Sequence, residues 1–144
     1  MLESKIYSSF KIEGKVIECK KHGKGNINDT YLLKTNTNKY IIQTINKNVF
    51  KNPKKLMKNI YTVTTYLKEN NQDYKGIKII KTNKNKLYYK KNNKYYRCYE
   101  YIDDCDCVCV TNDLELVYEM GKAVGNFDKS LLNLNKNKLF PIIP

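Results

Sequence analysis

Two short apolar runs separated by a polar, asparagine-rich bend place the strongest constraint on the fold of this chain. The runs cover residues 30–33 and 40–45, and the bend between them covers residues 35–39. Short runs of β-branched and aromatic residues on either side of Asn-rich turn residues are typical of a β-hairpin. We therefore expect two antiparallel strands here, with the other elements arranged around them.

A glycine-containing segment comes directly before the first of these strands. It consists of Gly23, Lys24, Gly25, Asn26, Ile27 and Asn28. Glycines allow the backbone to approach a ligand closely, and their N–H groups can point together at phosphate oxygens. Two glycines are equally typical of a plain connection between strands, so the segment alone supports both interpretations.

The residues before and after the hairpin predict two helices and a strand. A short helix is expected over residues 2–10, followed by a strand over 16–20. Asn52 and Pro53 are a favourable helix start, because Asn caps well and Pro suits the first helical position. The helix expected over residues 53–67 has one apolar face, and we expect it to pack on the sheet. The lysines at 54, 55 and 58 take its solvated side.

The second half of the chain predicts three more strands and a second long helix. The strands are expected over residues 76–80, 87–89 and 95–102, with a polar turn over 90–94. Asn112 is expected to open the helix, with Glu115 as its capping-box partner. The apolar residues of that helix lie on one stripe, which consists of Leu116, Met120, Ala123, Val124, Phe127 and Leu131. The element order predicts an α+β fold with a mostly antiparallel sheet and one main packed helix.

Composition limits the classes of function. The formal net charge is +13, which raises the question of nucleic-acid binding. Arg97 is the only arginine, however, and arginine is the residue best suited to bidentate phosphate and guanine contacts. The lysines are spread along the chain, and the excess of Lys, Asn, Ile and Tyr follows from A- and T-rich codons. Composition therefore argues against a nucleic-acid partner.

Cellular location and cysteine chemistry follow from the same composition. No apolar run is long enough to cross a membrane, and the first residues lack a secretory signal, so we expect a cytoplasmic protein. Reduced thiols are the rule there. Cys105, Cys107 and Cys109 alternate and could join Cys98 on zinc, but this spacing is not that of the usual structural zinc sites. We expect free thiols and no metal at these cysteines.

The spacing of residues 25–67 resembles a known family. Gly25-Asn26-Ile27-Asn28-Asp29-Thr30-Tyr31 is followed by Tyr40-Ile41-Ile42-Gln43-Thr44-Ile45-Asn46, then by Val49-Phe50, Pro53, Leu56-Met57, Asn59-Ile60, Val63-Thr64 and Leu67. This pattern resembles the amino-terminal lobe of the aminoglycoside phosphotransferase and choline kinase-like superfamily, and within it the N-acetylhexosamine 1-kinase type. The resemblance implies a protein-kinase-like small lobe over residues 1–102. It also implies that residues 103–144 are a linker and the first helix leading to a second lobe.

The resemblance also implies a site for ATP between two lobes. The segment from Gly23 to Asn28 would hold the phosphates, and the hinge at Glu100, Tyr101 and Ile102 would offer backbone groups to adenine. In such proteins the catalytic Asp and the Mg²⁺ ligands belong to the second lobe. His22 is the only histidine, so this chain contains no His-x-Asp catalytic loop. We expect a fragment or truncated product of a longer phosphotransferase that acts on a small molecule such as an N-acetylhexosamine.

One position departs from the kinase-like pattern. Such lobes usually carry a lysine on the third strand, paired with a glutamate on the following helix. Here the strand residue is Gln43, and the helix over 53–67 contains no acidic residue, which leaves Asn59 as a candidate partner. A neutral amide pair would hold phosphate less strongly than a lysine. The alternative is that Gln43 is simply a solvent-facing strand residue.

Three functions remain open at this point. The first is the ATP-binding lobe of a small-molecule kinase, which would use Mg²⁺. The second is a non-catalytic binding or regulatory module that has kept the small lobe. The third, which composition disfavours, is a basic nucleic-acid-binding domain. Because the second helix would lack its partner lobe, its apolar stripe also predicts self-association.

Overall fold

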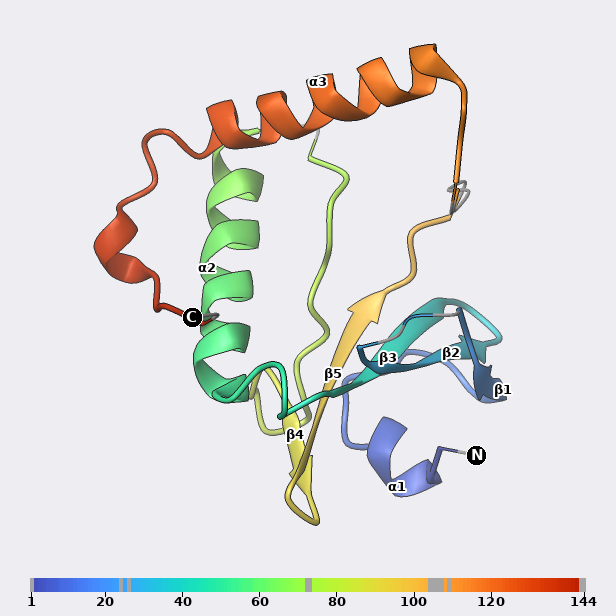
Figure 1. Cartoon of the computed structure of the whole chain (residues 1–144). Helices are drawn as coiled ribbons and strands as arrows, with labels where there is room; N and C mark the ends of the chain where they lie inside the picture. Colours follow the sequence, from blue (N-terminus) through green and yellow to red (C-terminus); the bar gives the residue numbers. More distant parts are fainter. Residues whose placement is uncertain are drawn as a thin grey trace.

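Five strands form a single antiparallel sheet in the order β1-β2-β3-β5-β4 (Figure 1). The computed structural model describes residues 2–23, 25, 27–71, 74–103, 108 and 110–142. The strands are β1 (Val16–Lys21), β2 (Asp29–Thr35), β3 (Lys39–Ile45), β4 (Tyr89–Lys91) and β5 (Lys94–Glu100). The fold class is therefore α+β, as the sequence predicts.

The hairpin that dominates the sequence is present as β2 and β3. The two strands pair in antiparallel register, with Leu32 opposite Ile41. At the bend, the Thr35 N–H donates to the carbonyl of Asn38 over 2.8 Å, and the Asn38 N–H donates to the Thr35 hydroxyl over 2.9 Å. The polar bend thus satisfies its own backbone groups, which confirms the hairpin prediction.

One face of the sheet carries the main core. Leu33, Ile42 and Cys98 are fully buried there. The short helix α1 (Ser4–Tyr7) packs against these side chains through Ile6. The helix expected over residues 2–10 is thus only four residues long. Just after the end of this helix, the Ser9 hydroxyl donates to the carbonyl of Lys5. This bond competes with the backbone bonds that would continue the helix.

The long helix α2 (Pro53–Asn70) packs on the other face of the sheet. Met57 is fully buried against Ile45 of β3 and Tyr95 of β5. The Asn52 side chain accepts from the N–H of Lys55 over 3.1 Å, as expected for the cap. The lysines at 54, 55 and 58 are exposed. Both the start of this helix and its solvated side agree with the sequence.

Two of the predicted strands differ from the structure. Residues 76–80 do not form a strand and make only one bridge, between Ile79 and Tyr99. The reason lies in β5, whose outer edge is divided: β4 pairs with its first half and the segment around Ile79 with its second half. The strand expected over 87–89 is shifted to β4, because Asn92 and Asn93 form a tight turn with φ of 46° and 60°.

The second long helix, α3 (Leu114–Ser130), extends away from the sheet (Figure 1). The Asp113 side chain caps it by accepting from the N–H groups of Glu115 and Leu116, so the prediction of Asn112 as the cap is wrong by one residue. A carboxylate at this position also suits the positive end of the helix dipole. No residue of α3 is buried. Its apolar stripe is exposed from Leu116 to Phe127, and Leu131 is half-buried.

The chain returns to α2 after α3. The 3₁₀-helix η1 (Lys136–Lys138) precedes Phe140, whose backbone is bound by the Asn59 side chain. Asn59 Nδ2 donates to the Phe140 carbonyl over 2.8 Å, and the Phe140 N–H donates to Asn59 Oδ1 over 2.9 Å. In the part of the chain that the structure describes, no helix is both long and apolar enough to cross a membrane.

Candidate functional site

The glycine segment between β1 and β2 is fixed at both of its ends. The His22 N–H donates to the carbonyl of Thr30 over 2.9 Å, and Asn28 Oδ1 accepts from the Asn46 N–H over 2.9 Å. Gly23 has φ of 74°, a conformation that favours glycine. Gly25 and Ile27 are exposed, whereas Lys24 and Asn26 lie outside the described residues. The segment is therefore anchored at both ends and exposed at Gly25 and Ile27, its described residues in between.

The predicted hinge follows the end of β5. Two of its three N–H groups are already used: Glu100 donates to the Lys78 carbonyl and Tyr101 to the Lys39 carbonyl, each over 3.0 Å. Among the described residues, the N–H of Ile102 has no acceptor. Ile102 is also exposed. Of the three N–H groups in the predicted hinge, only that of Ile102 is therefore left without a partner among the described residues.

Aromatic contacts bring the loop and the hinge together. The rings of His22 and Tyr101 meet edge to face, with their centroids 6.1 Å apart. Lys39 Nζ lies 5.3 Å from the centroid of the same Tyr101 ring, and Lys39 also pairs with Asp103. The base of the glycine loop thus contacts the hinge directly, although the two segments are far apart in the sequence.

Two hollows lie beside these segments. One, of about 330 Å³, is lined by Gly25, Ile27 and Asn28 together with the end of β3. The other, of about 220 Å³, lies beside Glu100 and Tyr101. Each predicted segment therefore borders open space of its own.

Gln43 is held in a side-chain network on the sheet. Its Oε1 accepts from Arg97 Nε over 3.0 Å, and its Nε2 donates to the Thr30 hydroxyl over 3.0 Å. Gln43 and Arg97 are register partners on β3 and β5. The predicted pairing with Asn59 is wrong, because α2 directs Asn59 at the backbone of Phe140 instead. The alternative of a solvent-facing Gln43 is also not what the structure has, since this side chain is half-buried and bonded at both ends.

Arg97 is a residue of this region that the sequence did not single out as a ligand group. Its guanidinium is half-buried and lies 5.2 Å from the centroid of the Tyr99 ring. Burial lowers the pKa of Arg97 from its ordinary value. Burial likewise raises the pKa of Tyr99 to about 12. The sequence feature that could have drawn attention to Arg97 is its composition, because Arg97 is the only arginine in a chain that is rich in lysine.

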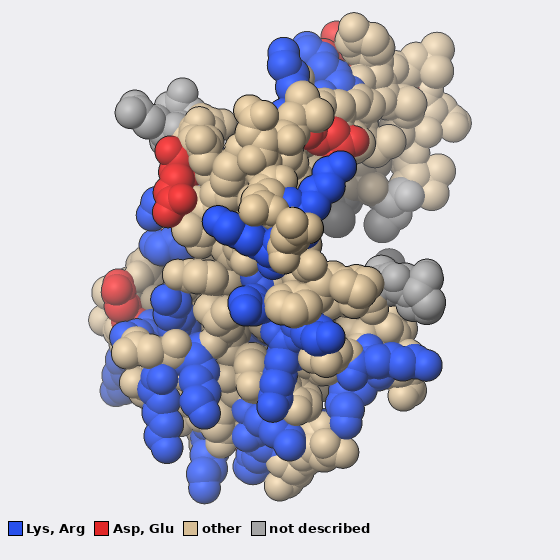
Figure 2. Space-filling model, turned by 90° about the vertical axis from the view of Figure 1, so that its left-hand side faces the viewer, with Lys and Arg blue, Asp and Glu red and all other residues tan. Residues whose placement is uncertain are grey.

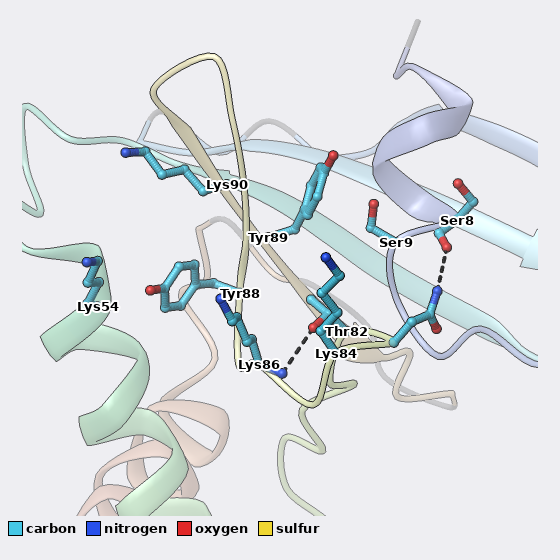
Figure 3. A pocket seen from close by; sticks show the side chains of 10 residues that line it. Ser8, Ser9, Lys54, Thr82, Lys84, Lys86, Tyr88, Tyr89 and Lys90 are labelled. Carbon is cyan, nitrogen blue, oxygen red and sulfur yellow. Dashed lines mark hydrogen bonds between the residues drawn. The ribbon is translucent and has the colours of Figure 1, made fainter.

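The hollow drawn in Figure 3 contains none of the predicted site residues. It has a volume of about 560 Å³ and lies between the end of α1, the start of α2 and the segment around Thr82. Its charged lining residues are Lys54, Lys84, Lys86 and Lys90. The Lys86 N–H donates to the Thr82 hydroxyl over 3.0 Å, so that the segment is folded on itself there (Figure 3). Figure 2 shows lysines crowding the lower part of the face that it presents, with few carboxylates between them.

The structure shows the state of only some of the cysteines. Cys98 lies in the core, and burial raises its pKa, which favours the neutral thiol. Cys105, Cys107 and Cys109 lie outside the described residues, so their metal-free state stays a prediction. Within the described residues, no three His, Cys, Asp or Glu side chains cluster as metal ligands would. A site for Mg²⁺ in this chain is thus not identified among those residues.

Comparison with solved structures places the fold. No protein-family model matches the chain. An aminoglycoside phosphotransferase from Alicyclobacillus acidocaldarius subsp. acidocaldarius DSM 446 is similar with a TM-score of 0.50 and 13% sequence identity, over 70% of this chain and 27% of that one. A spectinomycin phosphotransferase in complex with ADP and spectinomycin is similar with a TM-score of 0.52 and 14% identity, over 88% of this chain and 33% of that one.

The chain shares its fold with phosphotransferases. Its sheet and helices correspond to the kinase-like small lobe that the resemblance implied, so the predicted fold class is confirmed. At this level of identity the likeness concerns the fold alone. The chain spans about a third of the length of the structures it matches. The N-acetylhexosamine 1-kinase type stays a prediction.

Proposed function

We propose that this chain is the nucleotide-binding part of a phosphotransferase that moves the γ-phosphate of ATP to a hydroxyl of a small molecule, such as an N-acetylhexosamine. The observation that carries the proposal is the contact of His22 with Tyr101, which joins the glycine loop to the hinge. Phosphoryl transfer depends mainly on positioning and charge neutralisation. A loop for phosphates beside a hinge for adenine is the part of that task that a small lobe performs.

Each half of the nucleotide has a candidate binding group in this chain. Ile102 is exposed and its N–H has no acceptor among the described residues, so this group is suited to an acceptor nitrogen of adenine. Gly25 itself has no side chain that would keep phosphate oxygens away from its backbone. Mg²⁺ ligands and a catalytic Asp would come from a second lobe, so this chain would bind the nucleotide without acting on it alone.

Chemical-shift mapping with ATP tests this proposal. We expect shifts in the loop around Gly25 and at Ile102, with a dissociation constant of ~1 mM, which corresponds to about 4 kcal/mol. Adenosine should shift the hinge alone, because it lacks the phosphates. Shifts confined to the hollow lined by Lys84 and Lys86 would contradict the proposed site.

A non-catalytic regulatory module is the alternative within the same fold. Both proposals expect ATP binding, and they differ in what happens when a second lobe is present. ATP turnover assayed with N-acetylhexosamines, other sugars and choline separates them when the chain is joined to a second lobe, because only the kinase should then turn over ATP. We expect none from this chain alone, and turnover that is lost on replacing residues of this chain would contradict that expectation.

The lysine-rich face in Figure 2 favours one further candidate, a nucleic-acid-binding domain. The hollow in Figure 3 is lined by lysines and by Tyr88 and Tyr89, and such aromatic rings can stack on bases. Arginine is absent from this lining. Affinity for single-stranded DNA that falls steeply with salt would support this candidate, and equal affinity at 50 and 200 mM salt would exclude a phosphate-dominated contact.

We also propose that α3 mediates self-association when it is not covered by a second lobe. Met120, Val124 and Phe127 of its apolar stripe are 62%, 57% and 48% exposed. A second copy of the same stripe would bury them. Sedimentation of the chain at rising concentration tests this, and a monomer at millimolar concentration would contradict it.

A further inference from the structure

Arg97 is a partly desolvated cation without a matching carboxylate. Among the described residues, no Asp or Glu oxygen lies within salt-bridge distance of its guanidinium. Carboxylates elsewhere on the sheet are paired with lysines: Glu18 with Lys20 and Lys34, and Glu100 with Lys78. Burying an unpaired charge is costly. Such an arrangement calls for an anion from outside these residues.

The hydrogen bonds of Arg97 leave most of its donors available. A guanidinium has five N–H donors in a rigid fork, and within the described residues only Nε–H donates to another side chain, that of Gln43. The Tyr99 ring lies 5.2 Å from the guanidinium and contributes a cation–π contact. The Gln43 bond and the aromatic ring thus orient the group while its outer nitrogens stay unused, which is the geometry that suits a planar, bidentate contact with an oxyanion.

The same network leads from Arg97 to the glycine loop. Gln43 donates to the Thr30 hydroxyl, and that hydroxyl lies 3.4 Å from the carbonyl of Asn28, the last residue of the loop. Asn28 in turn holds the end of β3 through the Asn46 N–H. The arginine and the last residue of the loop are therefore linked by one series of hydrogen bonds.

We propose that Arg97, oriented by Gln43, binds a phosphate group of the nucleotide on this face of the sheet. It would supply the positive charge that a kinase-like lobe usually takes from a lysine on the third strand, where this chain has Gln43. The assignment rests on the proposed function for the identity of the nucleotide, but the oxyanion site itself rests on the unpaired guanidinium. A purely structural role predicts no response of Arg97 to phosphate.

The test uses the 144-residue chain with three probes: ATP, adenosine and inorganic tripolyphosphate. Arg97 is the only arginine, so its side-chain Nε–H signal in a nitrogen-edited NMR spectrum is unique. We expect ATP and tripolyphosphate to shift this signal and adenosine to leave it unchanged. Arg97→Gln should weaken binding of both phosphates by about tenfold, the loss expected for a charged hydrogen bond. Lys90→Gln is the control, because it removes one positive charge at a site without this role.

The outcomes separate the two proposals. If ATP shifts the loop and hinge of the natural chain and Arg97→Gln binds it equally well, the role of Arg97 is overturned and the proposed function stands. If ATP shifts neither segment but tripolyphosphate shifts the Arg97 signal, the nucleotide proposal fails and the oxyanion site stands. An Arg97 signal that neither phosphate moves overturns the site. That measurement needs no variant, so it holds even if Arg97→Gln does not fold.

Discussion

Replacing Gln43 with charged residues tests the network at the centre of the candidate site. Gln43 Oε1 lies 3.0 Å from Arg97 Nε, so a charge at position 43 would act on the guanidinium at close range. Two unit charges 4 Å apart interact by about 4 kcal/mol at an effective dielectric constant of 20. Gln43→Glu adds this attraction, which the cost of desolvating the new carboxylate offsets. We expect its free energy of unfolding to stay within about 1 kcal/mol of that of the natural chain.

Gln43→Lys should lower the free energy of unfolding. It removes an acceptor from a charged donor, a loss of about 2 kcal/mol, and adds repulsion between two cations. We expect Gln43→Lys to unfold at least ~3 kcal/mol more easily than Gln43→Glu. Gln43→Met, which has similar size and no charge, is the control and should fall between the two.

Urea unfolding at pH 7 and low salt measures these differences. A carboxylate at position 43 beside Arg97 should have a lowered pKa, so the stability that it contributes is present at neutral pH and is lost as pH falls through that pKa. Gln43→Glu should also neutralise the oxyanion site and abolish the tripolyphosphate response of Arg97. Equal stability of the Glu and Lys variants would refute the Gln43–Arg97 contact.

Three further substitutions test the core, a buried phenol and the tail. Met57→Ala should lower the free energy of unfolding by about 2–5 kcal/mol, because the side chain is fully buried, whereas Met120→Ala on the exposed face of α3 should change it by less than ~0.5 kcal/mol. Burial raises the pKa of Tyr99 from near 10 in the unfolded chain to about 12 in the folded one. The natural chain should therefore lose roughly 2–3 kcal/mol of its free energy of unfolding as pH rises from 10 to 12. Tyr99→Phe should remove this loss, because phenylalanine has no group that ionises. Comparing urea midpoints of both proteins at pH 9 and pH 11.5 measures this, and equal slopes would contradict it. Asn59→Ala removes both bonds to the Phe140 backbone, so the Phe140 amide should exchange its hydrogen at least ~10-fold faster while global stability changes by about 1 kcal/mol or less; unchanged exchange would contradict the docking of the tail.

Local patterns predicted the elements whose stability is local. The hairpin of β2 and β3 follows from apolar runs around a bend that bonds to itself through Thr35. The start of α2 follows from Asn52, whose side chain acts only on the helix it precedes. The segment 76–80 has the composition of a strand, but β4 occupies part of the β5 edge that it would need. Competition for one edge is a tertiary effect, which residue patterns do not encode.

The candidate site was predicted in part for a similar reason. The glycine loop could be named because glycines and asparagines mark it locally. The partner of Gln43 could not, because Arg97 is 54 positions away and meets it only through the register of β3 and β5. A shift of one residue in that register would have placed Arg97 beside a different side chain. The prediction that Asn59 pairs with Gln43 was wrong, because helical periodicity shows on which face of α2 Asn59 lies but not which segment packs there.

The exposed stripe of α3 and the unpaired guanidinium of Arg97 point to the same physical conclusion. A helix of 17 residues with no buried side chain gains little from tertiary packing, which supplies most of the stability of helices in proteins. The half-buried guanidinium of Arg97 has a desolvation cost that no carboxylate among the described residues offsets. An apolar partner surface would suit the exposed stripe, and an oxyanion would suit the guanidinium. A phosphotransferase with its second lobe and nucleotide would supply both, which is why the two features support one function rather than two.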